Sequence, residues 1–181
     1  NINIIDRHQK DVFKEKKFGD VVYTYVKTSS YQGNGFSRII NFLQFPFRLL
    51  LNHKKLERPD LIYTSSPSPF AAVMAVIIAK KMHVPALLEV RDLWPQTLVA
   101  YGGYSKKNPI IRLMYCMERW MYKHADRIVF TFEGGADYIK DKGWDGDIKL
   151  SKVFNINNGV DLAEYKANLS EPFEDPDLDD N

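Results

Sequence analysis

The sequence predicts an α/β fold with a mainly parallel sheet and helices on both of its faces. One observation is a β-α-β unit, in which a strand over 61–64 and an apolar helix over 70–82 precede a buried strand over 86–91. A second is that the alternation continues, with a helical pattern from 109 to 123 followed by a β-branched segment over 127–132. Parallel strands bring their carboxyl ends to one edge of a sheet, so polar residues that follow them should gather there.

Composition limits the class of protein. The chain has 181 residues, of which 45% are hydrophobic, and a formal net charge of +2. These values predict one domain with a real core, and they give no global reason to expect a nucleic-acid partner. The single cysteine, Cys116, excludes an internal disulfide and lies in a helical apolar pattern that predicts a buried position. No stretch approaches the ~18 continuous apolar residues of a membrane span.

Two segments precede the β-α-β unit. Lysines near the start of the chain (Lys10, Lys14, Lys16 and Lys17) are interpreted as a solvated surface, and the strand pattern begins at Val21 and ends at Val26. From 36 to 51 the sequence predicts a helix with a broad apolar face and a narrow polar stripe, which Pro46 should kink or split. Positively charged residues, among them Lys54 and Lys55, follow this helix directly. The helix therefore either packs on its own sheet or rests on anionic lipid, with Arg38, Arg48, Lys54 and Lys55 facing the membrane.

Local signals position the remaining elements. Ser68 and Pro69 suit the start of the apolar helix. In the helix from 109 the predicted core positions recur at spacings of three and four: Ile110, Leu113, Met114, Met117 and Met121. Glu118 should tie this helix to a basic neighbour. A last strand is expected over 149–156, a turn over 157–161, and an acidic tail from 169 to 181 after a domain that covers 1–168.

The stretch from Ala86 to Pro95 (ALLEVRDLWP) organises the chain. Its apolar strand leads into Glu89, Arg91 and Asp92, which should therefore lie at the carboxyl end of a strand. Ser65 and Ser66 end the preceding strand at the same edge. Three charges beside an apolar run either neutralise one another as an internal ion pair or meet a polar ligand in a cleft.

Several kinds of enzyme lack their motifs here. The sequence contains no Gly-x-Gly-x-x-Gly after a strand, no phosphate-binding loop that ends in Gly-Lys-Ser/Thr, and no Gly-x-Ser-x-Gly. The four histidines are scattered without the spacing of metal ligands. The sequence therefore predicts neither a metal site nor a resident cofactor.

The motifs, taken in order, resemble those of a known family. The stretch from Glu89 to Pro95 is preceded by Ser65-Ser66-Pro67, and Glu118, Ala125-Asp126 and Asn158-Gly159-Val160-Asp161 follow it. This order resembles the amino-terminal domain of family 4 retaining glycosyltransferases. With Tyr31 to Gly35 (YQGNG) and Arg38, it is most similar to the bacterial amino-sugar transferases of capsule and O-antigen synthesis.

The resemblance implies one Rossmann-like half of a two-domain GT-B fold that binds the acceptor. A second half would bind the nucleotide-sugar donor, expected to be a UDP-sugar, and the fold itself needs no metal. Asp92 and Arg91 would face the reacting sugar, although many members have a histidine at the position of Arg91. The cleft would also be lined by Ser65, Ser66, Glu89, Gly134, Asn158 and Gly159. An opening strand with its glycine-rich loop is expected before residue 1.

The resemblance further implies a polyprenyl-diphosphate-linked saccharide as acceptor and a location on the inner face of the bacterial cytoplasmic membrane. The segment should be inactive alone, because the groups around the leaving phosphate belong to the other half. Two alternatives remain open. One is a non-catalytic acceptor-binding subunit that recruits a separate donor subunit, and the other is half of a sugar-nucleotide epimerase.

Overall fold

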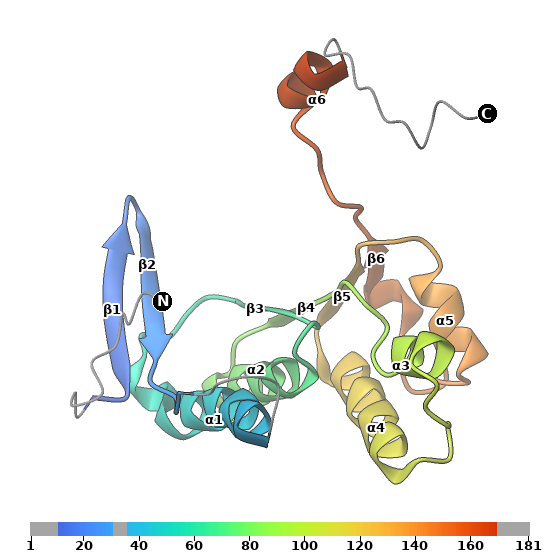
Figure 1. Ribbon diagram of the computed structural model, residues 1–181, viewed down its shortest axis with the longest axis horizontal. Coiled ribbons are helices and arrows are strands. Elements are labelled where there is room, and N and C mark those ends of the chain that lie inside the picture. Colours follow the sequence, from blue (N-terminus) through green and yellow to red (C-terminus); the bar gives the residue numbers. More distant parts are fainter. Residues whose placement is uncertain (1–10, 31–35, 170–181) are drawn as a thin grey trace.

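The computed structural model describes residues 11–30 and 36–169. Figure 1 shows a parallel sheet, a separate antiparallel hairpin and the surrounding helices. The strands are β1 (Phe13–Phe18), β2 (Val21–Val26), β3 (Ile62–Ser65), β4 (Ala86–Val90), β5 (Arg127–Phe130) and β6 (Val153–Asn155). The α-helices are α1 (Phe36–Asn52), α2 (Pro69–Met82), α3 (Gln96–Tyr101), α4 (Pro109–His124), α5 (Gly135–Asp141) and α6 (Leu162–Leu169). Short 3-10 turns, η1 (His53–Lys55) and η2 (Leu150–Lys152), precede β3 and β6.

The central sheet has the strand order β3-β4-β5-β6, and each neighbouring pair is parallel. The predicted class, an α/β fold with a mainly parallel sheet flanked by helices, is confirmed. Ser68 and Pro69 start α2 as expected, and His83 ends it in the left-handed region at φ 53°. The last strand is shorter than predicted, because η2 occupies the beginning of the expected segment.

The core lies between the sheet and α2, α4 and α5. Leu88, Val90, Ile128 and Phe130 alternate along β4 and β5 and are fully buried or nearly so. They pack with helix residues that include Ala72, Tyr122 and Ile139. Burying one large apolar side chain stabilises a fold by roughly 1.5–3 kcal/mol, so this layer is the main source of stability.

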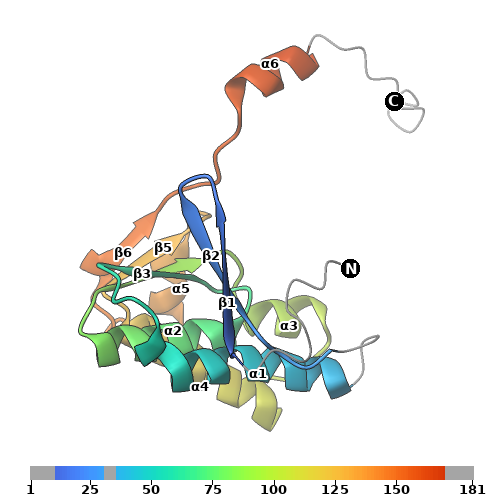
Figure 2. The same cartoon turned by 90° about the vertical axis from the view of Figure 1, so that its left-hand side faces the viewer.

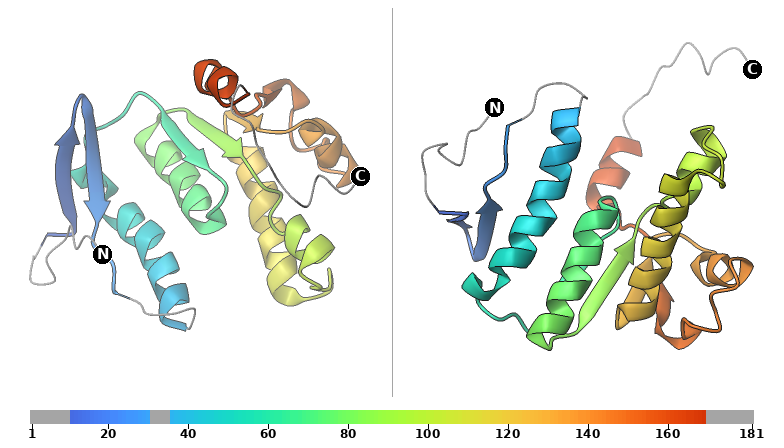
Figure 3. Two further views of the ribbon diagram at one scale, coloured as in Figure 1. Left: turned by 45° about the horizontal axis from the view of Figure 1, so that its top comes forward. Right: turned by 90° about the horizontal axis from the view of Figure 1, so that it is seen from below.

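Helices α1, α2 and α4 lie side by side in one layer, as Figure 3 shows from below. α1 is one continuous helix that contains Pro46, so the prediction that this proline could split it is wrong. Pro46 is buried, and the helix continues although proline removes one of its hydrogen bonds.

The polar stripe of α1 serves a purpose that the sequence did not reveal. Asn41 donates to the hydroxyl of Thr28 at 2.9 Å, and Gln44 accepts from the backbone N–H of Ser29 at 2.7 Å. The guanidinium of Arg48 donates to the carbonyl of Lys27 at 2.5 Å. These three residues therefore hold the chain where it leaves β2.

The β1-β2 hairpin was only half predicted. β2 has its expected bounds, but residues 13–18 form a strand rather than unpatterned surface. The lysines of β1 are exposed, as predicted, and Lys16 lies over the ring of Phe18 at 4.6 Å. Figures 1 and 2 show this hairpin outside the parallel sheet, beside α1.

The predicted core face of α4 is confirmed only in part, because Met121 is buried and Met114 and Met117 are half-buried, but the other two of the five positions are not. Ile110 and Leu113 are exposed, whereas Ile111, Glu118, Met121 and Tyr122 are buried. Cys116 is exposed, so its predicted core position is wrong. The physical reason is that α5 and Trp144 receive the tyrosines and Glu118 of α4, which turns the 110, 113 and 116 positions outward.

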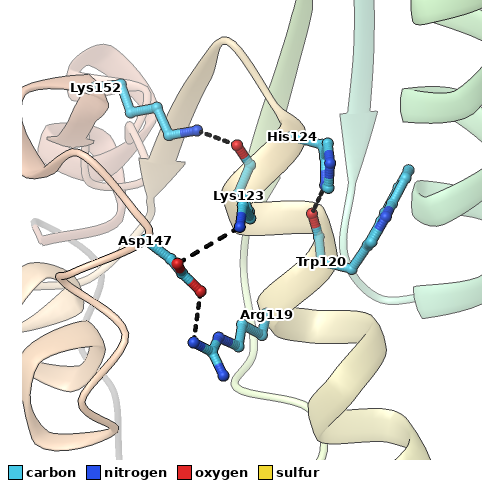
Figure 4. Close-up of polar contacts among 6 residues, drawn as sticks. All are labelled: Arg119, Trp120, Lys123, His124, Asp147 and Lys152. Atoms are coloured by element: carbon cyan, nitrogen blue, oxygen red, sulfur yellow. Dashed lines mark hydrogen bonds and ion pairs between the residues drawn. The ribbon is translucent and has the colours of Figure 1, made fainter.

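The carboxyl end of α4 is fastened to the segment before β6 (Figure 4). Asp147 pairs with Arg119 at 2.5 Å and with Lys123 at 3.5 Å. The ammonium of Lys152 donates to the carbonyls of Lys123 and Ala125. The two Lys152 bonds satisfy carbonyls that the end of a helix leaves without partners.

After β6 the chain runs away from the sheet to α6, all of whose residues are exposed (Figure 1). This helix was not predicted. The proposed boundary at residue 168 falls within its last turn, and the acidic tail lies outside the described residues.

Candidate functional site

Polar side chains meet at the carboxyl ends of β3 and β4. Ser65 and Glu89 are register partners, and the hydroxyl of Ser65 donates to Glu89 Oε2 at 2.6 Å. This bond lowers the pKa of the Glu89 carboxyl below its usual value, against partial burial, with help from a Tyr63 hydrogen bond and the charge of Arg91. Glu89 is therefore an ionised acceptor at neutral pH. Burial and the contact with Glu89 raise the pKa of Tyr63.

Ser66 fixes the loop that follows β4. It is 5% exposed, its backbone N–H donates to the carbonyl of Glu89 at 2.9 Å, and its hydroxyl accepts from the N–H of Arg91 at 3.1 Å. The same hydroxyl lies 3.5 Å from the carbonyl of Asp92. A buried serine therefore ties the backbone of the Arg91-Asp92 loop to the end of β3.

The side chains of Arg91 and Asp92 are both exposed at this edge. In the described part of the chain, Arg91 forms no ion pair with Glu89 or Asp92, although its charge acts on Glu89. Of the two interpretations from sequence, the internal ion pair is therefore not the arrangement found. Two opposite charges on a rigid loop remain open to solvent and to a polar ligand.

A hydrogen-bond network that the sequence did not predict begins shortly after this loop in the chain. Gln96, at the start of α3, accepts from the hydroxyl of Tyr115 and the ammonium of Lys142, both at 2.8 Å. Lys142 also lies 4.1 Å from the centre of the Tyr115 ring. Residues from α3, α4 and the end of α5 thus hold one another, and a long-range contact of this kind leaves no local sequence signal.

Glu118 forms the buried part of the same region. Its carboxyl accepts from the hydroxyls of Tyr122 and Tyr138, each at 3.0 Å. Burial raises the pKa of Glu118 to about 8, although both hydrogen bonds and the charge of Lys142 act to lower it. The prediction that Glu118 pairs with a basic residue is wrong for its hydrogen bonds, because two tyrosine hydroxyls make them and Lys142 acts only through its charge.

Residues 19–149 match the model of the glycosyl transferase 4-like domain. This span covers more than half of the chain. The chain belongs to the glycosyl transferase 4-like domain family. No curated protein matches the sequence significantly. A glycosyltransferase domain of this kind implies sugar transfer from a nucleotide-sugar donor to an acceptor.

Gly134, which was expected near the cleft of this glycosyltransferase domain, and its neighbour Gly135 have structural roles of their own. Gly134 has φ +87°, a conformation that favours glycine. A Cβ on Gly135 would lie 2.2 Å from the ring of Phe130. Both glycines are therefore needed where α5 begins at the end of β5, and Gly134 itself is exposed.

Asn158 and Gly159 lie on the exposed stretch between β6 and α6. Within residues 11–30 and 36–169, no hydrogen bond joins them to the Ser65, Glu89 or Asp92 loops. The structure thus brings together Ser65, Ser66, Glu89, Arg91 and Asp92, and among the described residues Asn158 and Gly159 are not bonded to that cluster.

The residues expected to face a membrane differ in their surroundings. Lys54 and Lys55 are exposed on η1, whereas Arg48 is half-buried against Lys27. Arg38 is exposed and lines a hollow of about 250 Å³ with Phe42, Leu43 and Phe70. The Tyr31 to Gly35 stretch lies outside the described residues.

Two further features of the described residues concern membranes and metal ions. None of their helices is both long enough and apolar enough to cross a membrane. Their His, Cys, Asp and Glu side chains form no group of three or more that could hold a metal ion.

Proposed function

We propose that this domain binds the acceptor in a retaining glycosyltransferase that builds capsular or O-antigen polysaccharide on a polyprenyl-diphosphate carrier. The reaction breaks the bond between the anomeric carbon and the diphosphate of a UDP-sugar, so that UDP leaves. It forms a bond from that carbon to an acceptor oxygen, whose proton passes to the departing diphosphate or to water. The observation that supports this role is the exposed Arg91-Asp92 pair, held by Ser66 at the carboxyl ends of parallel strands.

In this proposal the two charged side chains have different tasks. Asp92 accepts a hydrogen bond from the acceptor hydroxyl and orients it toward the sugar. Arg91 offers its guanidinium to anionic oxygens, which a planar fork of donors suits. Ser65 and Glu89 line the cleft, and the hydrogen bond between them holds both side chains in place. The family match supports glycosyl transfer rather than epimerisation.

The membrane location is a separate part of the proposal. α1 leaves Ile40, Phe47 and Leu51 exposed at helical spacings of seven and four, and η1 adds Lys54 and Lys55. Apolar area next to cations is typical of elements that rest on anionic lipid. The variant Lys54→Gln/Lys55→Gln should therefore bind vesicles containing phosphatidylglycerol less tightly than the unchanged chain does. Equal binding of the variant and the unchanged chain would contradict the proposed membrane contact of α1 and η1.

A paired calorimetric titration tests the assignment of the acceptor. The chain is titrated with a short polyprenyl-diphosphate sugar and with a UDP-sugar, and both are repeated for Asp92→Ala. We expect the lipid-linked sugar to bind and Asp92→Ala to weaken that binding by about tenfold, the value of one lost charge-assisted hydrogen bond. Asp60→Ala, which removes another exposed carboxylate just before β3, is the matched control. Binding of the UDP-sugar alone would show that the domain serves the donor.

A further inference from the structure

The connection between α3 and α4 exposes apolar side chains that the core does not use. Tyr101 is 90% exposed, Tyr104 51%, Ile110 66% and Leu113 58%. Single exposed apolar residues are ordinary, but here four of them fall within thirteen consecutive positions. We refer to Tyr101, Tyr104, Lys106, Lys107, Ile110 and Leu113 as the α3-α4 surface.

The inward face of α4 explains why these residues point outward. Ile111 and Glu118 are buried, and the hydroxyl of Tyr115 donates to Gln96 at the start of α3. Ile110 and Leu113 lie three apart on the remaining face, with Cys116 a further three along and also exposed. The exposure of Ile110 and Leu113 therefore follows from the packing of α4.

The charge of this segment has one sign. Lys106, Lys107 and Arg112 are exposed, and no Asp or Glu occurs from residue 93 to residue 117. Tyrosine side chains beside lysine and apolar residues are favoured at the boundary between lipid headgroups and acyl chains. Each lysine near an anionic leaflet also adds to the attraction.

The α3-α4 surface and α1 share one side of the molecule. Figures 1 and 3 show α1 and the beginning of α4 on the same side of the parallel sheet, with α2 between them. A flat partner that reaches α1 can therefore reach the beginning of α4 as well.

We propose that the α3-α4 surface is a second contact with an anionic bilayer, beside the contact proposed for α1. This inference rests on the proposed function, because an acceptor on a lipid carrier requires the domain to lie on a membrane. A second contact would fix the orientation of the domain and hold the nearby Asp92 loop at a set height above the lipid.

The same observations disfavour other occupants. A symmetric dimer through this surface would set its lysines and Arg112 against the same cations of the second copy, with no carboxylate in the segment to neutralise them. A nucleic acid would use the cations and tyrosines but would gain little from Ile110 and Leu113. A bilayer uses both the apolar and the charged members.

Vesicle association provides the test. The chain and its variants are sedimented with vesicles of phosphatidylcholine alone and with vesicles in which a third of the lipid is phosphatidylglycerol. Lys106→Gln/Lys107→Gln should weaken association with the anionic vesicles about thirtyfold, because each lysine near such a surface contributes about 1 kcal/mol. Tyr101→Ser should weaken it too, and the high exposure of Tyr101 means that the fold does not depend on its ring.

A matched control separates position from net charge. Lys16→Gln/Lys17→Gln removes two adjacent exposed lysines of β1, near the tip of the hairpin that Figure 1 shows pointing away from the helix layer. We expect it to bind as the unchanged chain does. Cys116, the only cysteine, can carry an environment-sensitive dye next to Leu113, and its emission should shift to the blue on anionic vesicles only.

The outcomes are distinguishable from failure of the proposed function. If Lys54→Gln/Lys55→Gln weakens association and the α3-α4 variants do not, this inference is wrong while the α1 contact stands. If only the α3-α4 variants weaken it, the inference holds without α1. Three results would each overturn it: an equal loss in the Lys16/Lys17 control, no vesicle association at all, or a dimer in solution that the α3-α4 variants dissociate.

Discussion

Glu118 is a carboxyl group that the fold keeps out of water in the middle of α4. It is 2% exposed and receives hydrogen bonds from Tyr122 and Tyr138 rather than an ion pair. Desolvation of the charged form outweighs those bonds, which is why its pKa is raised to about 8. In an unfolded chain the same group would titrate near its usual 4.5. The folded state therefore holds a proton that the unfolded state has lost at neutral pH.

This proton makes stability depend on pH in a defined direction. Between pH 4.5 and about 8 the folded chain binds one more proton than the unfolded chain does, so the free energy of unfolding should fall as pH rises through that window. The slope from one proton is at most about 1.4 kcal/mol per pH unit. Below and above the window Glu118 should contribute no slope.

The variant Glu118→Gln isolates the effect, because an amide of the same shape can still bond both tyrosines but cannot ionise. Urea unfolding across the window should show a flatter profile for Glu118→Gln than for the unchanged chain. Parallel profiles would mean that Glu118 is charged in the folded state, and that Lys142 and the tyrosines neutralise it.

At the scale of elements, the contact of α5 with β5 depends on a missing side chain. Gly135 begins α5 directly over Phe130, and an added Cβ would lie 2.2 Å from that ring. Gly135→Ala should therefore lower the free energy of unfolding by about 1–3 kcal/mol, the usual cost of overpacking a core. Chemical denaturation measures this directly.

Gly146 supplies the comparison for that prediction. A Cβ at Gly146 meets no atom within 4 Å, so Gly146→Ala should change stability by no more than about 0.5 kcal/mol. If the two alanine variants were equally stable, α5 would be free to move away from the sheet and the close approach would not be needed.

At the scale of the whole molecule, one prediction concerns activity. Catalysis of glycosyl transfer depends on groups placed around the developing charge of the leaving phosphate. The resemblance assigns those groups to a donor domain, whereas the described residues supply Arg91 and Asp92 at the edge that we propose binds the acceptor. The purified chain of 181 residues should therefore not transfer a sugar by itself. A radiolabelled product that forms from the UDP-sugar and depends on Asp92 would contradict this.

Much of the architecture was determined by the sequence alone. Local signals, namely apolar periodicity, capping residues and strand order, predicted three features. These are the β-α-β unit, the start of α2 at Ser68-Pro69, and the position of Glu89, Arg91 and Asp92 after β4. Each of these features depends on residues that are close together in the sequence, so the sequence alone is enough to predict it. The grouping of Ser65 and Ser66 with that loop also follows, because parallel strands share their carboxyl edge.

Only the tertiary structure decided which partner each residue meets. Four features depend on segments that are distant in the sequence. They are the inward face of α4, the exposed position of Cys116, the tyrosine partners of Glu118, and the bonds by which Asn41, Gln44 and Arg48 hold the exit of β2. The apolar and polar stripes of a helix specify that it is amphipathic. Which neighbour covers each stripe depends on how the other elements pack, and that is a property of the folded chain.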